Sequence, residues 1–375
     1  MSYGLALYGV DRAVGRAVRT AAAALMTVAL VTPAVRASWT VVNLHPSGWY
    51  QSYAYGVAGG QQVGTVYDYY SYIPRAALWS GSASSFVDLH PSGWYESYAY
   101  GVAGGQQVGY VYGSIRSHAA LWSGSASSFV DLHPSEWYQS SFAFGVAGGQ
   151  QVGYARTNDY YNVNHAALWS GSASSFVDLH PTGWYQSRAW GVGDGQQVGD
   201  VYDYTYNPHA ALWSGSASSF VDLHPTGWYR SYALGVAGGQ QVGYAVPYGG
   251  NDRAALWSGS ASSFVDLHPS GWYQSYAYGV AGGLQVGTVY DYSNNRHAAL
   301  WSGSASSFVD LHAFLGPEFT SSEARSITQE YGFTYVVGFG YNSYMNRTEA
   351  LMWVIPEPAS LLGLGLALAL FPRRR

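Results

Sequence analysis

Short strand-like runs alternate with turn residues along most of the chain, and no helical periodicity competes with them. In one unit of about 44 residues the runs cover 97–102, 107–112, 118–122 and 128–132. A Gly-Gly dipeptide, which supplies the positive φ of a tight hairpin, separates the first two runs. A Gly-Ser-Ala-Ser turn joins the last two. Four short strands in this length predict one blade of a β-propeller.

The unit recurs along the chain. The tryptophan of a Leu-Trp-Ser motif returns at spacings of 43, 47, 44, 44 and 44 residues, and a weaker copy follows 52 residues later. An 11-residue string, Ser-Gly-Ser-Ala-Ser-Ser-Phe-Val-Asp-Leu-His, is identical in six copies. The motif tryptophans are Trp79, Trp122, Trp169, Trp213, Trp257, Trp301 and Trp353. Because such a period is typical of repeat architectures, we expect seven structural units.

The two ends of the repeat region complement each other. Six complete units run over 52–311, and the seventh, 322–354, supplies three strands. Residues 39–45 match the end of a repeat, so we expect residues 39–44 to pair with 350–354 and complete the last blade. The sequence thus predicts an all-β, seven-bladed β-propeller over 38–355. An open β-solenoid or a string of small sandwiches would leave the complementary half-units unexplained.

The repeat resembles the HAF family of extracellular repeats. The resemblance lies in His118-Ala-Ala-Leu-Trp, Val-Asp-Leu-His and Gly-Gly-Gln-Gln-Val-Gly-Tyr, and it covers roughly 39–354. The pattern departs where Arg75 and Arg253 replace the leading histidine, and the seventh unit retains little beyond Val337-Gly338 and the Leu-Met-Trp ending at Trp353. The family implies an extracellular β-rich repeat protein and no known reaction.

The first 37 residues have the pattern of a secretory signal peptide. Arg12, Arg16 and Arg19 precede an apolar run over 21–31, and small residues at 35 and 37 suit a signal peptidase. The run is too short for a membrane-spanning helix. A disordered, Ala-rich start is the alternative.

The last residues resemble the PEP-CTERM sorting signal of Gram-negative bacteria. A Pro-Glu-Pro motif is followed by an apolar stretch over 359–371 and an arginine cluster. The residues that carry this resemblance are Pro356, Glu357, Pro358, Arg373, Arg374 and Arg375. It implies processing by an exosortase, transient membrane contact through a short hydrophobic helix, and delivery to the cell surface or extracellular matrix. An ordinary core helix is disfavoured because nothing but charge follows the apolar stretch.

The composition narrows the classes of partner. The chain has no cysteine, so packing or repetition must replace disulfides in an exported protein. All 16 basic residues are arginines, and seven of them lie in the two predicted removable ends. The remaining nine face about 20 acidic residues, which is the opposite of what nucleic-acid binding requires.

Aromatic residues are the candidate ligand-binding groups. In a four-stranded blade, the loops between strands two and three and between one blade and the next emerge on the same face. Both kinds of loop are aromatic here, and the loops between strands two and three also vary in length between units, as binding loops on a repeated frame do. Their candidate contacts are Trp49, Trp94, Trp137, Trp184, Trp228, Trp272, Tyr69, Tyr70, Tyr204 and Tyr206. Such rings stack on sugar faces or on a protein partner; alternatively, each tryptophan is a wedge between blades.

Neither a metal site nor catalysis is predicted. The seven histidines that end the repeats would be spread around a rim, so they could not converge on one ion, and no cofactor is expected. They and the aspartates of Val-Asp-Leu are instead expected to form turn or inter-blade hydrogen bonds. Repeats multiply one arrangement sevenfold, whereas an active site needs unlike groups in one place. The residues that break the pattern are Glu136, Arg188, Trp190, Asp194 and Asp200.

The sequence therefore favours an exported, non-enzymatic surface or matrix protein that binds exopolysaccharide or another surface component. A secreted propeller enzyme acting on polysaccharide and a structural spacer without a ligand are the alternatives. A pair of carboxylates in one pocket would favour the enzyme, and a ring of equivalent aromatic sites would favour the binder.

Overall fold

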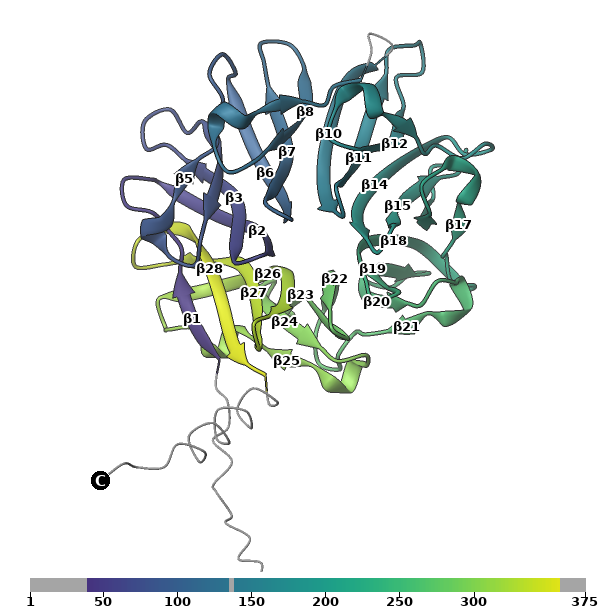
Figure 1. Ribbon diagram of the computed structural model, residues 1–375. Helices are drawn as coiled ribbons and strands as arrows, with labels where there is room; N and C mark the ends of the chain where they lie inside the picture. The colour runs from purple at the N-terminus through teal and green to yellow at the C-terminus, as the bar shows by residue number, and fades with distance from the viewer. Residues whose placement is uncertain (1–38, 135–137, 358–375) are drawn as a thin grey trace, which may run out of the picture. The chain divides into compact units, whose positions relative to one another are not determined.

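The computed structural model describes residues 39–134 and 138–357. Within these ranges the strands form seven four-stranded antiparallel sheets, arranged as blades around a central channel (Figure 1). In blades 1 to 6 the chain runs outward through four consecutive strands, as in the order β2-β3-β4-β5. The predicted seven-bladed propeller is confirmed.

The strands are named here by their place in the blade, from the channel outward. The innermost strands are β2 (Gln51–Ala58), β6 (Glu96–Ala103), β10 (Tyr138–Ala147), β14 (Gln186–Gly193), β18 (Trp228–Ala237), β22 (Gln274–Ala281) and β26 (Phe319–Glu330). The second strands are β3 (Gln61–Tyr67), β7 (Gln106–Tyr112), β11 (Gln150–Thr157), β15 (Gln196–Tyr202), β19 (Gln240–Pro247), β23 (Leu284–Tyr290) and β27 (Phe333–Asn342). The third strands are β4 (Pro74–Trp79), β8 (Ser117–Trp122), β12 (Asn164–Trp169), β16 (Pro208–Trp213), β20 (Arg253–Trp257), β24 (Arg296–Trp301) and β28 (Arg347–Pro356).

The outermost strands are shorter than the sequence predicted. They are β5 (Val87–Asp88), β9 (Val130–Asp131), β13 (Val177–Asp178), β17 (Val221–Asp222), β21 (Val265–Asp266), β25 (Val309–Asp310) and, in blade 7, β1 (Thr40–Asn43). The 3-10 turns η1 (Ala83–Ser85), η2 (Ala126–Ser128), η3 (Ala173–Ser175), η4 (Ala217–Ser219), η5 (Ala261–Ser263) and η6 (Ala305–Ser307) precede them, and η7 (His312–Phe314) follows β25. In blade 2, Ser128 accepts a hydrogen bond from the Ser123 amide at 2.8 Å and donates one to the Ser125 carbonyl at 2.6 Å. The serine-rich string thus forms the turn, which leaves two residues for the strand.

Glycine in the second strand permits the close pairing of β6 with β7. A Cβ atom on Gly109 would lie 1.7 Å from the Tyr98 carbonyl oxygen, so a larger residue cannot occupy this position without moving the backbone. The inner strand bulges between Ala99 and Gly101, which raises its local twist next to the channel. The Gly of the Gln-Val-Gly motif is therefore a packing requirement.

The hydrophobic core lies between neighbouring blades. One cluster joins Leu78 and Leu89 of blade 1 to Ala99 and Trp122 of blade 2. The motif tryptophans are fully buried in such clusters, and a buried tryptophan removes roughly 150–250 Å² of surface from water. Packing between repeats thus takes the place of disulfides, as the absence of cysteine requires.

A serine side chain bridges each pair of neighbouring blades. Between blades 3 and 4, Ser187 accepts the backbone N–H of Ala166 at 2.9 Å, and Nδ1 of His180 lies 2.9 Å from the same hydroxyl. Which of the two groups donates depends on the tautomer of His180. The bridging serines are Ser52, Ser97, Ser141, Ser187, Ser231, Ser275 and Ser322.

A buried glutamine links the Gly-Gly turn to the Gly-Ser turn of the same blade. Gln107 donates to the Gly105 carbonyl at 2.9 Å, accepts from the Gly124 amide at 2.7 Å, and reaches Gln61 of the preceding blade at 3.1 Å. Because buried amide groups need partners, this network fixes the Gly-Gly and Gly-Ser turns to each other.

The ring is closed by the N-terminal strand. β1 pairs antiparallel with β28, with Thr40 opposite Val354 and Asn43 opposite Leu351. The Leu44 amide continues the ladder to the Ala350 carbonyl at 2.8 Å. The predicted closure is confirmed.

The closing pair carries a different charge pattern from the other blades. In blade 4, Nδ1 of His209 lies 2.9 Å from Oδ2 of Asp222. In blade 7 the corresponding residues are Glu349 and Asn43, and Asn43 donates its amide to Glu349 at 2.7 Å. A basic group facing an aspartate is thus replaced by a glutamate facing an amide.

Candidate functional site

The loop face is the side of the ring on which the chain enters each blade and on which the second strand connects to the third. Antiparallel pairing in every blade brings these loops to one side, and ring contacts between them confirm the arrangement predicted from sequence. The Gly-Gly and Gly-Ser turns lie at the other ends of the strands.

Tyrosines from the two loops of a blade contact each other and form tyrosine clusters. In blade 1 the Tyr50 ring lies edge-on to Tyr69 and Tyr72, with centroids 5.7 and 5.1 Å away. In blade 4, Tyr185 lies 4.9 Å from Tyr206 and 6.2 Å from Tyr204. Simpler pairs occur in blade 5 (Tyr229 and Tyr248) and blade 6 (Tyr273 and Tyr292).

Aspartates hold the tyrosine loops in shape. Oδ1 of Asp68 accepts the amides of Tyr70 and Ser71 at 2.8 and 2.7 Å, and Asp203 accepts those of Thr205 and Asn207 at 2.8 and 2.9 Å. Hydrogen bonds from the Ser71 and Tyr70 backbone keep the pKa of Asp68 below its ordinary value. These carboxylates therefore stabilise the conformation of their own loops.

The candidate tyrosines and tryptophans differ in exposure. The side chain of Tyr70 is 96% exposed and that of Tyr204 is 69% exposed. The tryptophans are half-buried: Trp94 packs against Phe129 and His118 with centroids 5.8 and 5.1 Å away and joins the cluster between blades 1 and 2. Similar half-buried positions belong to Trp49, Trp184, Trp228 and Trp272, whereas Trp137 lies outside the described residues. The geometry thus favours the wedge interpretation for the described tryptophans and leaves the tyrosines as the accessible groups.

Two clefts open among these residues. One of about 530 Å³ lies between blades 3 and 4 and is lined by Tyr161, Tyr185 and Tyr204 together with Asp159, Val163, His165 and His180. The other, of about 640 Å³, lies in blade 2 beside Trp94, Tyr95 and Tyr112. Both volumes fall in the range of roughly 300–1,000 Å³ that is usual for small-ligand sites.

The repeat-ending histidines lie in the serine bridges. In His45, His224 and His268, Nε2 also meets a tryptophan backbone carbonyl at 3.1 Å. Burial lowers the pKa of His45 and His180 to about 4, so the imidazoles are neutral at pH 7. In the ranges 39–134 and 138–357, no three His, Cys, Asp or Glu residues gather as metal ligands would.

Three of the residues that break the repeat pattern meet in blade 4. Asp200 is fully buried, accepts Nε of Arg188 at 3.1 Å, and accepts the indole N–H of Trp190. Its complete burial raises its pKa, and the adjacent guanidinium opposes that rise. Asp194 lies apart, in a turn on the opposite face, where it accepts the Gly238 amide at 2.6 Å; Glu136 lies outside the described residues.

A second charged group in blade 7 was missed by the sequence analysis. Glu323 is buried and accepts hydrogen bonds from Arg296 and Arg325. Aligning Ser322-Glu-Ala-Arg-Ser with the Ser-Tyr-Ala-Tyr-Gly of other units would have revealed both substitutions, but the seventh unit is too divergent for the alignment to stand out.

The predicted sorting motif begins inside the fold. Pro356 ends β28, and the Glu357 amide donates to the Gly332 carbonyl at 2.9 Å. Pro358, the apolar stretch and Arg373 to Arg375 lie outside the described residues, as does the whole predicted signal peptide over 1–37. None of the helices among the described residues is long and apolar enough to span a membrane.

No family model and no curated protein matches the sequence. Among solved structures, puromycin hydrolase is similar with a TM-score of 0.55 and 11% identity over 80% of this chain and 53% of its own. A puromycin-hydrolyzing peptidase of Mycobacterium tuberculosis gives 0.53 and 12% over 82% and 54%. The β-propeller domain of the Trilobed protease from Pyrococcus furiosus, which has an open velcro topology, gives 0.56 and 9% over 81% and 95%.

These comparisons show that the chain has the propeller fold found as a domain in peptidases, and that it spans about half the length of the hydrolases. They correct the expectation that the chain is not an enzyme, because solved enzymes contain a domain of similar fold; they do not establish an enzymatic role for this chain. Repetition also does not exclude unique charged groups: Arg188 meets Asp200 in blade 4, and Arg296 of blade 6 meets Glu323 of blade 7. At 9–12% identity the likeness shows the fold alone.

Proposed function

We propose that this protein is exported to the surface of a Gram-negative bacterium and binds polysaccharide through the tyrosine clusters of its loop face. The observation that carries the proposal is the grouping of exposed tyrosines on one side of a rigid ring, with clefts between them. Tyrosine rings stack on the C–H faces of sugars, while their hydroxyls hydrogen-bond to sugar hydroxyls.

Backbone strain supports a binding role for these loops. Tyr72 and Tyr206 have φ values of 55° and 63°, in the left-handed region that favours glycine. A non-glycine residue there costs on the order of 1–3 kcal/mol, and such strain is concentrated at functional sites. The aspartate hydrogen bonds hold the loops in this conformation before a ligand arrives, which reduces the entropy lost on binding.

Export and sorting complete the proposal. The Pro356–Glu357 end of the propeller is continued by the apolar and arginine-rich tail, which resembles a PEP-CTERM signal. Processing by an exosortase would place the ring among exopolysaccharide. Several weak sugar sites on one rigid ring would then act together through avidity.

The test is retention by polysaccharide. A variant with Tyr69, Tyr70, Tyr204 and Tyr206 replaced by Ser is expected to lose at least tenfold in affinity, because each stacking ring contributes about 1 kcal/mol. Affinity electrophoresis in gels containing alginate, dextran or soluble cellulose derivatives measures the retention, and thermal unfolding checks the fold.

The matched control is Tyr331→Ser. Tyr331 is 79% exposed and also has a positive φ, 56°, but it lies in the turn between β26 and β27, on the opposite face. Its variant should migrate like the native protein. Equal losses in both variants, or no retention of the native protein by any polysaccharide, would leave the structural spacer as the better interpretation.

A further inference from the structure

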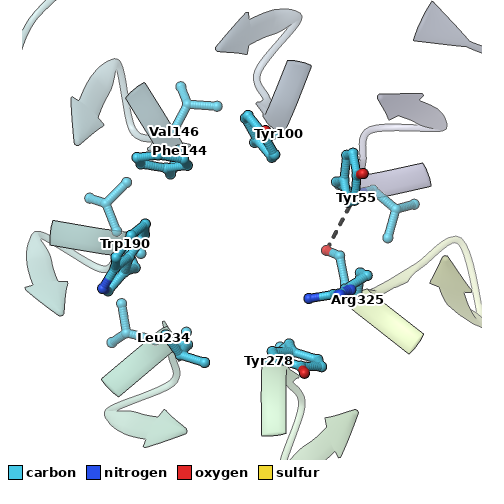
Figure 2. A pocket seen from close by; sticks show the side chains of 18 of the residues that line it. Tyr55, Tyr100, Phe144, Val146, Trp190, Leu234, Tyr278 and Arg325 are labelled. Carbon is cyan, nitrogen blue, oxygen red and sulfur yellow. Dashed lines mark hydrogen bonds between the residues drawn. The ribbon is translucent and has the colours of Figure 1, made fainter. Parts of the chain in front are cut away.

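Seven equivalent side chains form a ring around the channel, one from each innermost strand. Each precedes the glycine, or in blade 7 the serine, at the bulge of its strand. They are Tyr55, Tyr100, Phe144, Trp190, Leu234, Tyr278 and Arg325 (Figure 2). With Tyr244 and Tyr276 they line an open cavity of about 400 Å³, and a second part of about 220 Å³ lies along the glycine and valine residues of the innermost strands. The channel is thus large enough for a small molecule.

One side of this ring is a continuous aromatic wall. The centroids of Tyr55 and Tyr100 lie 5.1 Å apart, those of Tyr100 and Phe144 5.2 Å, and those of Phe144 and Trp190 4.8 Å. The indole N–H of Trp190 is already donated to Asp200, so this residue presents its ring to the channel. An apolar, planar group would be well accommodated here.

The other side carries a guanidinium. Nη2 of Arg325 donates to Glu323, whereas its Nε is buried and has no hydrogen-bond partner in the described part of the chain. The side chain retains 30% exposure, and Figure 2 shows one of its nitrogens directed toward the centre of the ring. The guanidinium stacks on Tyr278 at 4.3 Å, which fixes its position.

The charge around Arg325 is not balanced. Arg296 of blade 6 and Arg325 of blade 7 share the single carboxylate of Glu323, which leaves an excess of one positive charge where these two blades meet. Across the channel, Asp200 is neutralised by Arg188. Behind the aromatic wall, Glu96 accepts the hydroxyl of Tyr98. On the side of Tyr278, Asp252 accepts the hydroxyl of Tyr276, so this carboxylate is already engaged by a residue that lines the cavity. In a chain of formal net charge −5, this position is one that an anion would prefer.

We propose that the channel binds a small aromatic carboxylate, with its carboxylate on Arg325 and its ring against the wall formed by Tyr55, Tyr100, Phe144 and Trp190. Planar guanidinium groups bind carboxylates through paired hydrogen bonds, and burial strengthens such contacts. None of the residues that line the cavity belongs to the tyrosine clusters of the loop face, and the proposal does not depend on polysaccharide binding.

The test compares two probes of the same shape. Titration calorimetry with 3-phenylpropionate and with the neutral 3-phenylpropan-1-ol is expected to show at least tenfold tighter binding of the acid to the native protein. Arg325→Leu should weaken binding of the acid about tenfold or more and leave the alcohol unchanged. Leucine already occupies this ring position in blade 5, and Arg296 still pairs with Glu323 in the variant. No binding of the acid at about 10 mM, or native affinity in Arg325→Leu, would overturn the proposal.

Two further variants keep the test decisive. The double variant Tyr100→Leu with Phe144→Leu should weaken both probes, because it shortens the aromatic wall while retaining the arginine. Should Arg325→Leu not fold, equal affinity of the native protein for acid and alcohol is sufficient to reject the site. The loop-face variant Tyr204→Ser with Tyr206→Ser should bind 3-phenylpropionate like the native protein, so failure of the channel site and failure of the polysaccharide proposal are distinguishable.

Discussion

At the scale of single residues, the aromatic side chains of the loop face divide into two roles. Trp228 packs against Phe264 at 4.8 Å between blades 4 and 5, whereas Tyr70 is almost fully exposed. Aromatic residues of the same kinds of loop thus serve packing in one case and lie at the surface in the other.

This division predicts different effects on stability. Trp228→Ala should lower the free energy of unfolding by about 2 kcal/mol, less than a fully buried tryptophan because Trp228 is half-buried. Tyr70→Ala should leave it within about 0.5 kcal/mol of the native value. Urea unfolding at pH 7.5 compares the two. A Trp228→Ala protein as stable as Tyr70→Ala would show that the wedge interpretation is wrong.

Sequence reasoning located the tryptophans and tyrosines but could not separate their roles, because exposure depends on the neighbouring blade. It also missed the serine bridges. Ser187 appears as one small polar residue in a strand, and only the fold brings the Ala166 amide and His180 to it. The charged group of Glu323 and Arg325 was hidden for the same reason: its significance lies in the channel, where distant units meet.

At the scale of elements, the repeat period and the half-units at the two ends were sufficient to predict seven blades and closure by residues 39–44. The boundaries of the outermost strands were less predictable. Val130 and Asp131 form a strand of two residues because the preceding serines hydrogen-bond to their own backbone. Periodicity does not reveal such local competition.

The closing strand β1 pairs an amide with a carboxylate where the other blades pair a carboxylate with a basic group. Asn43 donates to Glu349, which also accepts Nε of Arg347 at 2.7 Å; although burial disfavours the charged carboxylate, these hydrogen bonds keep its pKa below the ordinary value. In other blades the corresponding pair joins an aspartate to a histidine or arginine. Pairing of β1 with a blade other than the seventh would therefore lose the contact with glutamate.

An Asn43→Asp variant tests whether the pairing of Asn43 with Glu349 contributes to closure of the ring. It places two carboxylates side by side and should lower the unfolding free energy by about 1–2 kcal/mol. The double variant Asn43→Asp with Glu349→His recreates the pair of the other blades and should recover most of that loss. Chemical denaturation of the three proteins at pH 7 measures both effects. If the double variant were no more stable than the single one, the complementary pattern would have no role in closure.

At the scale of the whole molecule, seven neutral histidines link the blades. The pKa of each bridge histidine is lowered, chiefly by burial, with His45 and His180 reaching about 4. The ordinary value in an unfolded chain is about 6.5. Between these values the unfolded chain binds more protons than the folded ring, so stability is complete above pH 6.5 and falls as the pH decreases toward 4.

The ring should therefore be acid-sensitive. Each additional proton bound by the unfolded chain adds about 1.4 kcal/mol per pH unit to the slope of stability against pH. The urea midpoint should fall steeply from pH 7 to pH 5. A His180→Asn variant, whose amide can still reach Ser187, should show a slope shallower by about one proton. A midpoint that stays constant from pH 7 to pH 5 would contradict the assignment of neutral imidazoles to the bridges.

The pairing of β1 with β28 also determines whether the termini can be joined and the chain opened elsewhere. Thr40 lies opposite Val354, so the first and last strands of the ring end side by side. A short peptide could join them, and new termini could be opened at a hairpin such as Gly104-Gly105, where the chain turns between β6 and β7. The order of blades around the axis would be unchanged. The polypeptide could therefore begin in any of the seven blades, and we expect the fold to tolerate circular permutation.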